Sequence, residues 1–170
     1  LTYAYSTSGT NTYVIYISAY NGSQFVSTSL SVTVLVQPKV VWCDEFNING
    51  APDITKWTSL IWEPGHVNNE LQSYTNRPQN AIVENGVLKI TAVREQYLGS
   101  SYTSARILTK GKFEAKYGRI EARIKLPRGK GLWPAFWMLG ANSDTVIWPQ
   151  CGEIDIMEYL GNSPTKIFGT

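Results

Sequence analysis

Residues 153–158 read Glu-Ile-Asp-Ile-Met-Glu, with three acids set among apolar residues in the alternating pattern of a β-strand. Strict alternation would place Glu153 and Asp155 on one face of the strand and Glu158 on the other, beside two isoleucines. Burying a carboxylate there is costly. A β-bulge at Met157 would add one residue and bring Glu158 round to the face of the other two acids. We therefore expect a bulged strand that carries three carboxylates on one face.

Strand patterns recur along the rest of the chain, and no helical periodicity accompanies them. Residues 120–126 alternate between apolar and charged side chains, which predicts a strand with one wet face. Two hairpins are expected at signals for a type I′ turn: the first has Asn21-Gly22 between strands at 13–20 and 29–34, and the second has Asn85-Gly86 and spans residues 81–92. Further strands are expected at 132–139 and 153–160. Many short strands separated by Gly, Pro and Asn predict an all-β fold, an antiparallel β-sandwich or jelly roll.

The composition excludes several classes of protein. The chain has 170 residues, 43% of them hydrophobic and 16% charged, so it can bury a core, and its net charge of +2 gives no argument for nucleic-acid binding. With the single histidine His66 and only Cys43 and Cys151, a Ser-His-Asp triad or a His/Cys zinc site is a poor fit. Whether the two cysteines form a disulfide stays open. No apolar run is long enough to span a membrane.

The acidic strand suits glycosidic bond cleavage. In a retaining glycosidase one carboxylate attacks the anomeric carbon, while a second protonates the leaving oxygen and later deprotonates water. An aspartate between two glutamates can share a proton with the nucleophile and keep the charges apart. A solvated acidic strand or a calcium site is the alternative. Ile154 and Ile156 favour the glycosidase, because they indicate that the opposite face is core.

Tryptophans near this strand suggest a sugar-binding surface. Trp133 and Trp137 have the same parity on the preceding predicted strand, so both should project to one face, where they could stack on sugar rings or else pack in the core. Trp148 lies in the loop that enters the acidic strand and could form a wall of the site. The remaining tryptophans are expected to pack in the interior: Trp42, Trp57 and Trp62.

Six ordered motifs resemble one enzyme family. Residues 153–158, preceded by Trp148-Pro149 and Gly152, resemble the catalytic signature of glycoside hydrolase family 16, in the bulged branch that includes laminarinases. The supporting stretches are Val-Trp-Cys-Asp-Glu-Phe at 41–46, Asn-Asn-Glu-Leu-Gln at 68–72, Thr-Ser-Ala-Arg at 103–106, Gly-Arg-Ile-Glu at 118–121 and Trp-Pro-Ala-Phe-Trp-Met-Leu at 133–139. The resemblance runs from Val40 to Thr170 and implies the first half or so of a concanavalin-like jelly roll.

The resemblance also implies roles for single residues. It makes Glu153 the nucleophile, Asp155 its assistant and Glu158 the acid/base. No cofactor is required for this chemistry. Further positions match sites that contact sugar hydroxyls, or a backbone carbonyl that can bind a structural Ca²⁺: Asn69 and Arg106 for the sugar, and Gly86 for the calcium, whose aspartate ligand would lie beyond Thr170.

The chain divides into two parts by its motifs. Residues 1–36 resemble the last strands of a PKD-type, Ig-like module, residues 37–39 form a linker, and residues 40–170 form an incomplete family domain that stops in a predicted strand. The expected protein is monomeric, and it is secreted or on the cell surface, as in bacterial polysaccharide degraders. We do not expect these 170 residues alone to form a competent enzyme.

The expected activity is retaining endo-hydrolysis of β-1,3-glucosidic bonds in laminarin-type glucan. One alternative is a galactanase of the same family that acts on agar, porphyran or carrageenan. Eight basic residues between 110 and 130 could attract a sulfated polymer, although interspersed acids suggest that they only line wet strand faces. The other alternative is a non-catalytic carbohydrate-binding β-sandwich.

Overall fold

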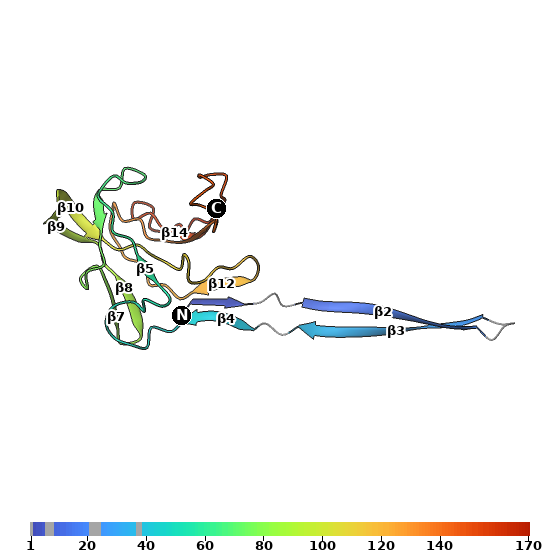
Figure 1. Ribbon diagram of the computed structural model, residues 1–170. Helices are drawn as coiled ribbons and strands as arrows, with labels where there is room; N and C mark the ends of the chain where they lie inside the picture. Colours follow the sequence, from blue (N-terminus) through green and yellow to red (C-terminus); the bar gives the residue numbers. More distant parts are fainter. Residues whose placement is uncertain (1, 6–8, 21–24, 37–38) are drawn as a thin grey trace.

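The computed structural model describes residues 2–5, 9–20, 25–36 and 39–170. The regular secondary structure in these ranges consists of β-strands alone, which confirms the all-β prediction (Figure 1). No helix within them has the length and hydrophobicity that crossing a bilayer requires. The strands are β1 (Thr2–Tyr5), β2 (Gly9–Tyr20), β3 (Phe25–Val36), β4 (Val40–Asp44), β5 (Thr58–Ser59), β6 (Gln72–Tyr74), β7 (Ala81–Glu84), β8 (Val87–Ile90), β9 (Val93–Tyr97), β10 (Ser100–Ser104), β11 (Ile107–Leu108), β12 (Arg119–Ala122), β13 (Ala135–Leu139) and β14 (Glu153–Glu158).

The N-terminal hairpin forms as predicted. Strands β2 and β3 pair antiparallel along their whole length, from Gly9 opposite Val36 to Tyr20 opposite Phe25. In Figure 1 this ribbon extends away from the body that holds the other strands. The predicted turn at Asn21-Gly22 lies outside the described residues. That residues 1–36 belong to a PKD-type module stays a prediction.

Strand β1 joins the body of the molecule. It lies between β12 and β4 in a three-stranded antiparallel sheet, with Thr2 opposite both Ala122 and Asp44. The pairing explains why β12 is shorter than the strand expected over residues 120–126. Its four residues match the four residues of β1, and β1 is the one strand with which β12 pairs in the described sheet. The predicted boundaries at 36 and 40 are not tested by this pairing and stay a prediction.

The hairpin predicted over residues 81–92 is confirmed as β7 and β8. Asn85 and Gly86 both have positive φ, 54° and 74°, as a type I′ turn requires. Ala81 and Val83 face inward and are 1% and 2% exposed. Period-two burial in β7 therefore follows directly from its alternating sequence.

A buried polar cluster lies beside this hairpin. Asn80 is fully buried, and its Nδ2 donates to Thr103 Oγ1 at 2.9 Å and to the Thr91 carbonyl at 3.2 Å. The hydroxyl of Thr75 donates to Asn80 Oδ1. Thr103 lies in β10, which pairs with both β6 and β9. Saturated hydrogen bonding is what allows these polar groups to be buried.

An aromatic cluster fills a second part of the interior. Trp42 stacks on Phe113 with ring centroids 5.4 Å apart and meets Trp57 edge-on at 5.3 Å. The indole N–H of Trp57 donates to Asp44 Oδ2 at 2.7 Å. Trp42 and Trp57 therefore pack as predicted.

Candidate active site

Strand β14 contains the predicted bulge. In its pairing with β13, Met157 lies opposite Phe136 while Asp155 lies opposite Trp137, so Ile156 is the extra residue. The irregularity thus lies within one residue of the expected position. Asp155 and Met157 are two residues apart, but their partners on β13 are consecutive. The side chains after the bulge therefore point to the opposite face from the one that strict alternation would give them.

The bulge places the three acids on one face. Glu153, Asp155 and Glu158 lie opposite Leu139, Trp137 and Ala135, which alternate along β13 and therefore share a face. Glu153 is exposed, whereas Asp155 and Glu158 are half-buried. No lysine, arginine or histidine in the described part of the chain pairs with any of the three.

The last residues of the chain run along the other edge of β14. The backbone N–H of Asp155 donates to the Thr170 carbonyl at 2.8 Å, and that of Glu158 donates to the Phe168 carbonyl at 2.9 Å. The bulge is therefore held from both sides, because Gly169 faces the extra residue. A Cβ on Gly169 would meet the Asp155 carbonyl at 3.3 Å.

The predicted strand over 132–139 is regular only from Ala135, yet Trp133 lies close to the carboxylates. Its indole Nε1 donates to Glu158 Oε1 at 2.8 Å, and the side chain remains 48% exposed. Trp133, predicted to stack on sugar or to pack in the core, thus donates a hydrogen bond to the predicted acid/base Glu158.

Trp137 belongs to a stack of side chains. The Arg106 guanidinium carbon lies 4.7 Å from the Trp137 ring centroid and 4.8 Å from that of Trp62. Trp62 in turn stacks on His66, with centroids 4.0 Å apart. Because Trp137 is the cross-strand partner of Asp155, this stack connects Arg106 with the carboxylate face. Trp62, expected only to pack in the interior, is therefore part of the site's surroundings.

A polar cluster continues from Trp62. The Tyr74 hydroxyl donates to Glu70 Oε2 at 2.7 Å, and Gln72 Nε2 donates to the same oxygen at 3.1 Å. Burial, followed by the hydrogen bond to Glu70, raises the pKa of Tyr74 to about 12. Sequence reasoning missed Tyr74 and His66. Gln72 and Tyr74 share a face of β6, so their parity was a usable signal, whereas the contact of His66 with Trp62 is made in a loop.

Two predicted sugar-binding residues lie apart from these contacts. Asn69 is exposed, in a left-handed conformation with φ of 54°, and Trp148 is 65% exposed. In the described structure neither makes a hydrogen bond or ring contact to Glu153, Asp155 or Glu158. Their sugar-binding roles stay predictions.

The calcium role of the Gly86 carbonyl stays a prediction, because its aspartate ligand is expected beyond Thr170. Gly86 is exposed, and no group of three or more His, Cys, Asp or Glu side chains comes together anywhere in the described ranges. Cys43 and Cys151, whose pairing the sequence left open, are half-buried free thiols.

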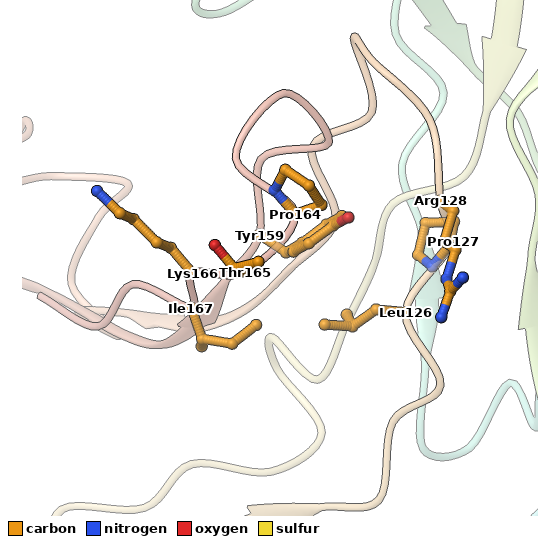
Figure 2. A pocket seen from close by; sticks show the side chains of 8 residues that line it. All are labelled: Leu126, Pro127, Arg128, Tyr159, Pro164, Thr165, Lys166 and Ile167. Carbon is orange, nitrogen blue, oxygen red and sulfur yellow. The ribbon is translucent and has the colours of Figure 1, made fainter.

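Two open hollows lie near β14. One, of about 320 Å³, is shown in Figure 2, where the amino group of Lys166 and the guanidinium of Arg128 lie at opposite ends and do not converge. The other, of about 380 Å³, is predominantly apolar and is lined by Ile120, Glu121, Ala122, Ile124, Leu126, Phe136, Ile156, Met157 and Ile167. Neither hollow is lined by any of the three clustered carboxylates.

Comparisons with known proteins agree with this geometry. The family model "Glycosyl hydrolases family 16" matches residues 68–170. A beta-glucanase of Rhodothermus marinus is 48% identical over 135 residues, which are 78% of this chain and 47% of that protein. A glucan endo-1,3-beta-glucosidase of Cryptopygus antarcticus is 47% identical over 135 residues, 76% of this chain and 48% of its own.

Solved structures give the same result. The laminarinase from Rhodothermus marinus superposes with a TM-score of 0.73 at 50% identity, covering 76% of this chain and 53% of that one. The chain spans about half the length of the curated relatives it matches. The chain has a bulged strand with three acids on one face, and its fold is like that of this laminarinase. The family model matches more than half of its residues, and the chain therefore belongs to glycosyl hydrolase family 16.

Proposed function

We propose that the protein hydrolyses β-1,3-glucosidic bonds within laminarin-type glucan, with retention of anomeric configuration. The observation that carries the proposal is the carboxylate face of β14, where Glu153, Asp155 and Glu158 lie together and pair with no cation among the described residues. Relatives named beta-glucanase and glucan endo-1,3-beta-glucosidase support glucan as the polymer.

In the proposed mechanism Glu153 attacks the anomeric carbon while Glu158 gives its proton to the leaving glycosidic oxygen. The C–O bond breaks and a glycosyl ester forms on Glu153. Glu158, now ionised, then takes a proton from water as the water oxygen attacks the same carbon. This second step releases the sugar, frees Glu153 and returns the proton to Glu158. Asp155, between them on the strand face, limits charge repulsion by sharing a proton with Glu153.

We propose that Arg106 and Trp137 hold the sugar beside these acids. A guanidinium over an indole ring is fixed in orientation, so Arg106 can present N–H donors to sugar hydroxyls. Trp133 is about half exposed and bonded to Glu158, so its ring can stack on a sugar next to this acid. Asn69 and Trp148 complete the proposed binding set as exposed residues that a longer oligosaccharide could reach.

The sulfated-galactan alternative has less support from the basic residues between 110 and 130. Lys110 forms an ion pair with Asp144, Lys112 Nζ donates to the Ile54 carbonyl, and Arg119 pairs with Glu121. Cations already engaged in the fold attract a polyanion less strongly. We also propose that the protein is a monomer that acts outside the cell, since a polysaccharide substrate does not enter it.

The test is the anomer that the full-length protein first releases from laminarin, followed by NMR during the reaction. We expect β-configured reducing ends before mutarotation, with lichenan, agarose and carrageenan assayed in parallel. Release of α-anomers would exclude the double displacement. Activity on a galactan but not on laminarin would keep the acids and refute the substrate, and binding without turnover on all four would favour the non-catalytic alternative.

A further inference from the structure

We propose that Trp133 is a positioning residue for Glu158. Its indole N–H holds one carboxyl oxygen, so that the proton given to the leaving group resides on the other. This inference rests on the proposed function and deepens it, because the sequence predicts that Trp133 stacks on sugar or packs in the core and assigns it no hydrogen bond to Glu158.

The contact itself is specific. Nε1 of Trp133 lies 2.8 Å from Oε1 of Glu158, a normal length for a charge-assisted hydrogen bond. The indole nitrogen is a donor only. Oε1 must therefore act as the acceptor, and a proton on this carboxyl group is directed to Oε2. Proton transfer needs such a defined donor within reach of the leaving oxygen.

The strand register explains why this indole reaches this carboxylate. Ala135 lies directly opposite Glu158. Trp133 precedes the first residue of β13, and the bonds from the Tyr159 N–H to the Pro134 carbonyl and from the Gly161 N–H to the Leu132 carbonyl continue the pairing past it. Trp133 therefore lies close to the position diagonal to Glu158. Diagonal neighbours on a sheet are within reach of aromatic side chains. The small methyl group of Ala135 leaves room for the indole to extend across to Glu158.

The backbone of Trp133 is held on both sides. The Pro134 carbonyl accepts from the Tyr159 N–H at 3.1 Å, and the Leu132 carbonyl accepts from the Gly161 N–H at 2.8 Å. The turn before Trp133 approaches Gly161 so closely that a Cβ there would lie 1.7 Å from the Gly129 carbonyl oxygen. The backbone that carries the indole is thus held by the fold, and this limits where the ring can lie relative to Glu158.

The chain contains a matched pair for comparison. Trp57 donates to Asp44 at 2.7 Å, so it makes the same indole-to-carboxylate bond as Trp133, but inside the aromatic cluster. Trp57→Phe and Trp133→Phe each delete one N–H and keep an apolar ring. They differ in whether the carboxylate belongs to the proposed reaction.

The experiment measures kcat/KM of the full-length protein and both variants on two substrates. One is laminarin, whose leaving group needs a proton, and the other is a β-1,3-glucan oligosaccharide with an activated aryl leaving group, which does not. For Trp133→Phe we expect a loss of about 10- to 100-fold on laminarin, the range for a hydrogen bond to a charged group. The loss on the aryl substrate should be less than about 3-fold. The loss on laminarin should appear in kcat rather than in KM. Trp57→Phe should lower the melting temperature and leave the ratio of the two rates unchanged.

Equal losses of Trp133→Phe on both substrates, an effect in KM alone, or no loss would overturn the inference. Glu158→Ala separates it from the proposed function. If Glu158→Ala also fails to spare the aryl substrate, the acid/base assignment itself is wrong. If Glu158→Ala spares it and Trp133→Phe does not, only the positioning role is refuted.

A second measurement covers the case in which Trp133→Phe does not fold. The indole ¹H–¹⁵N NMR signals are compared between the wild-type protein and Glu158→Ala. We expect one tryptophan signal to move upfield in the variant, because its hydrogen bond is lost. Indole signals that are identical in the two proteins would contradict the contact.

Discussion

Carboxylates play two different parts in this molecule, and β9 and β14 show the contrast. In β9, Glu95 accepts hydrogen bonds from Arg77 and from the Thr103 hydroxyl, which hold the pKa of its carboxyl below the ordinary value. In β14, Glu153 and Asp155 make no side-chain hydrogen bond to another described residue, and Glu158 accepts a single bond from Trp133. The charge of Glu95 is thus balanced by Arg77. The three acids of β14 pair with no cation in the described structure, which suits a nucleophile and a proton donor.

The contrast extends to what each region buries. Around Glu95 the polar groups of Asn80 and Thr103 are fully buried and hydrogen-bonded. Beside β14, by contrast, Ile154 and Ile167 are more than half exposed, so the expectation that Ile154 marks a buried core face is wrong in this structure. Stability and chemistry are therefore concentrated in different sheets of this chain. Substitutions in the two regions should have separable effects.

The largest expected effect is the separation of activity from stability by two isosteric changes. Glu153→Gln removes the proposed nucleophile and should lower kcat on laminarin by at least about 1,000-fold. The melting temperature should change little, because no cation in the described part of the chain pairs with this side chain. Glu95→Gln should do the reverse. It loses the ion pair with Arg77 and should lower the melting temperature by a few degrees while kcat is retained.

Both variants are measured in the full-length protein, their activity by reducing-end release and their stability by calorimetry. Laminarin binding by Glu153→Gln is the control that shows that the variant is folded. An active Glu153→Gln would refute the nucleophile assignment. If Glu95→Gln lost activity while folded, the division between the two regions would not hold.

Much of this contrast could be predicted from the sequence, because it depends on parity. The alternation of residues 153–158 conflicts with a regular strand, and only a bulge resolves the conflict without burying Glu158. The Asn85-Gly86 turn likewise follows from the φ values that those residue types tolerate. Patterns of this kind depend on a few neighbouring residues, so the bulge and the turn can be predicted without knowing the partner strand.

The contacts that parity does not determine could not be predicted. Trp133 and Trp62 are set by which distant segments meet them, Glu158 in one case and Arg106 and His66 in the other. The end of β12 is set by the length of β1, which lies more than a hundred residues earlier. These contacts and this strand end depend on tertiary pairing, which no local sequence pattern determines.

A smaller effect concerns the acid limb of stability. The pKa of Glu95 is lowered from 4.5, so the carboxylate favours the folded state above the unfolded pKa, and this contribution is lost as pH falls through the folded pKa. The free energy of unfolding of the wild-type protein should therefore approach that of Glu95→Gln below about pH 4.5. Denaturant melts at a series of pH values measure this. Parallel curves across the acid range would contradict a structural role for the ionised form of Glu95.

The smallest expected effect lies at the boundary between the two regions, where Glu70 is bound by Tyr74 rather than by a cation. The pKa of Tyr74 is raised to about 12, first by burial and then by the bond to Glu70. A raised pKa stabilises the folded protein below the ordinary value of 10, and this contribution is lost as pH rises through 12. Alkaline titration of tyrosinate absorbance should show one late-ionising group that Tyr74→Phe removes. Glu70→Gln should bring it only part of the way back toward 10, because burial, the larger cause, remains. A full return to 10 would instead make Glu70 the dominant cause and contradict the larger share given to burial.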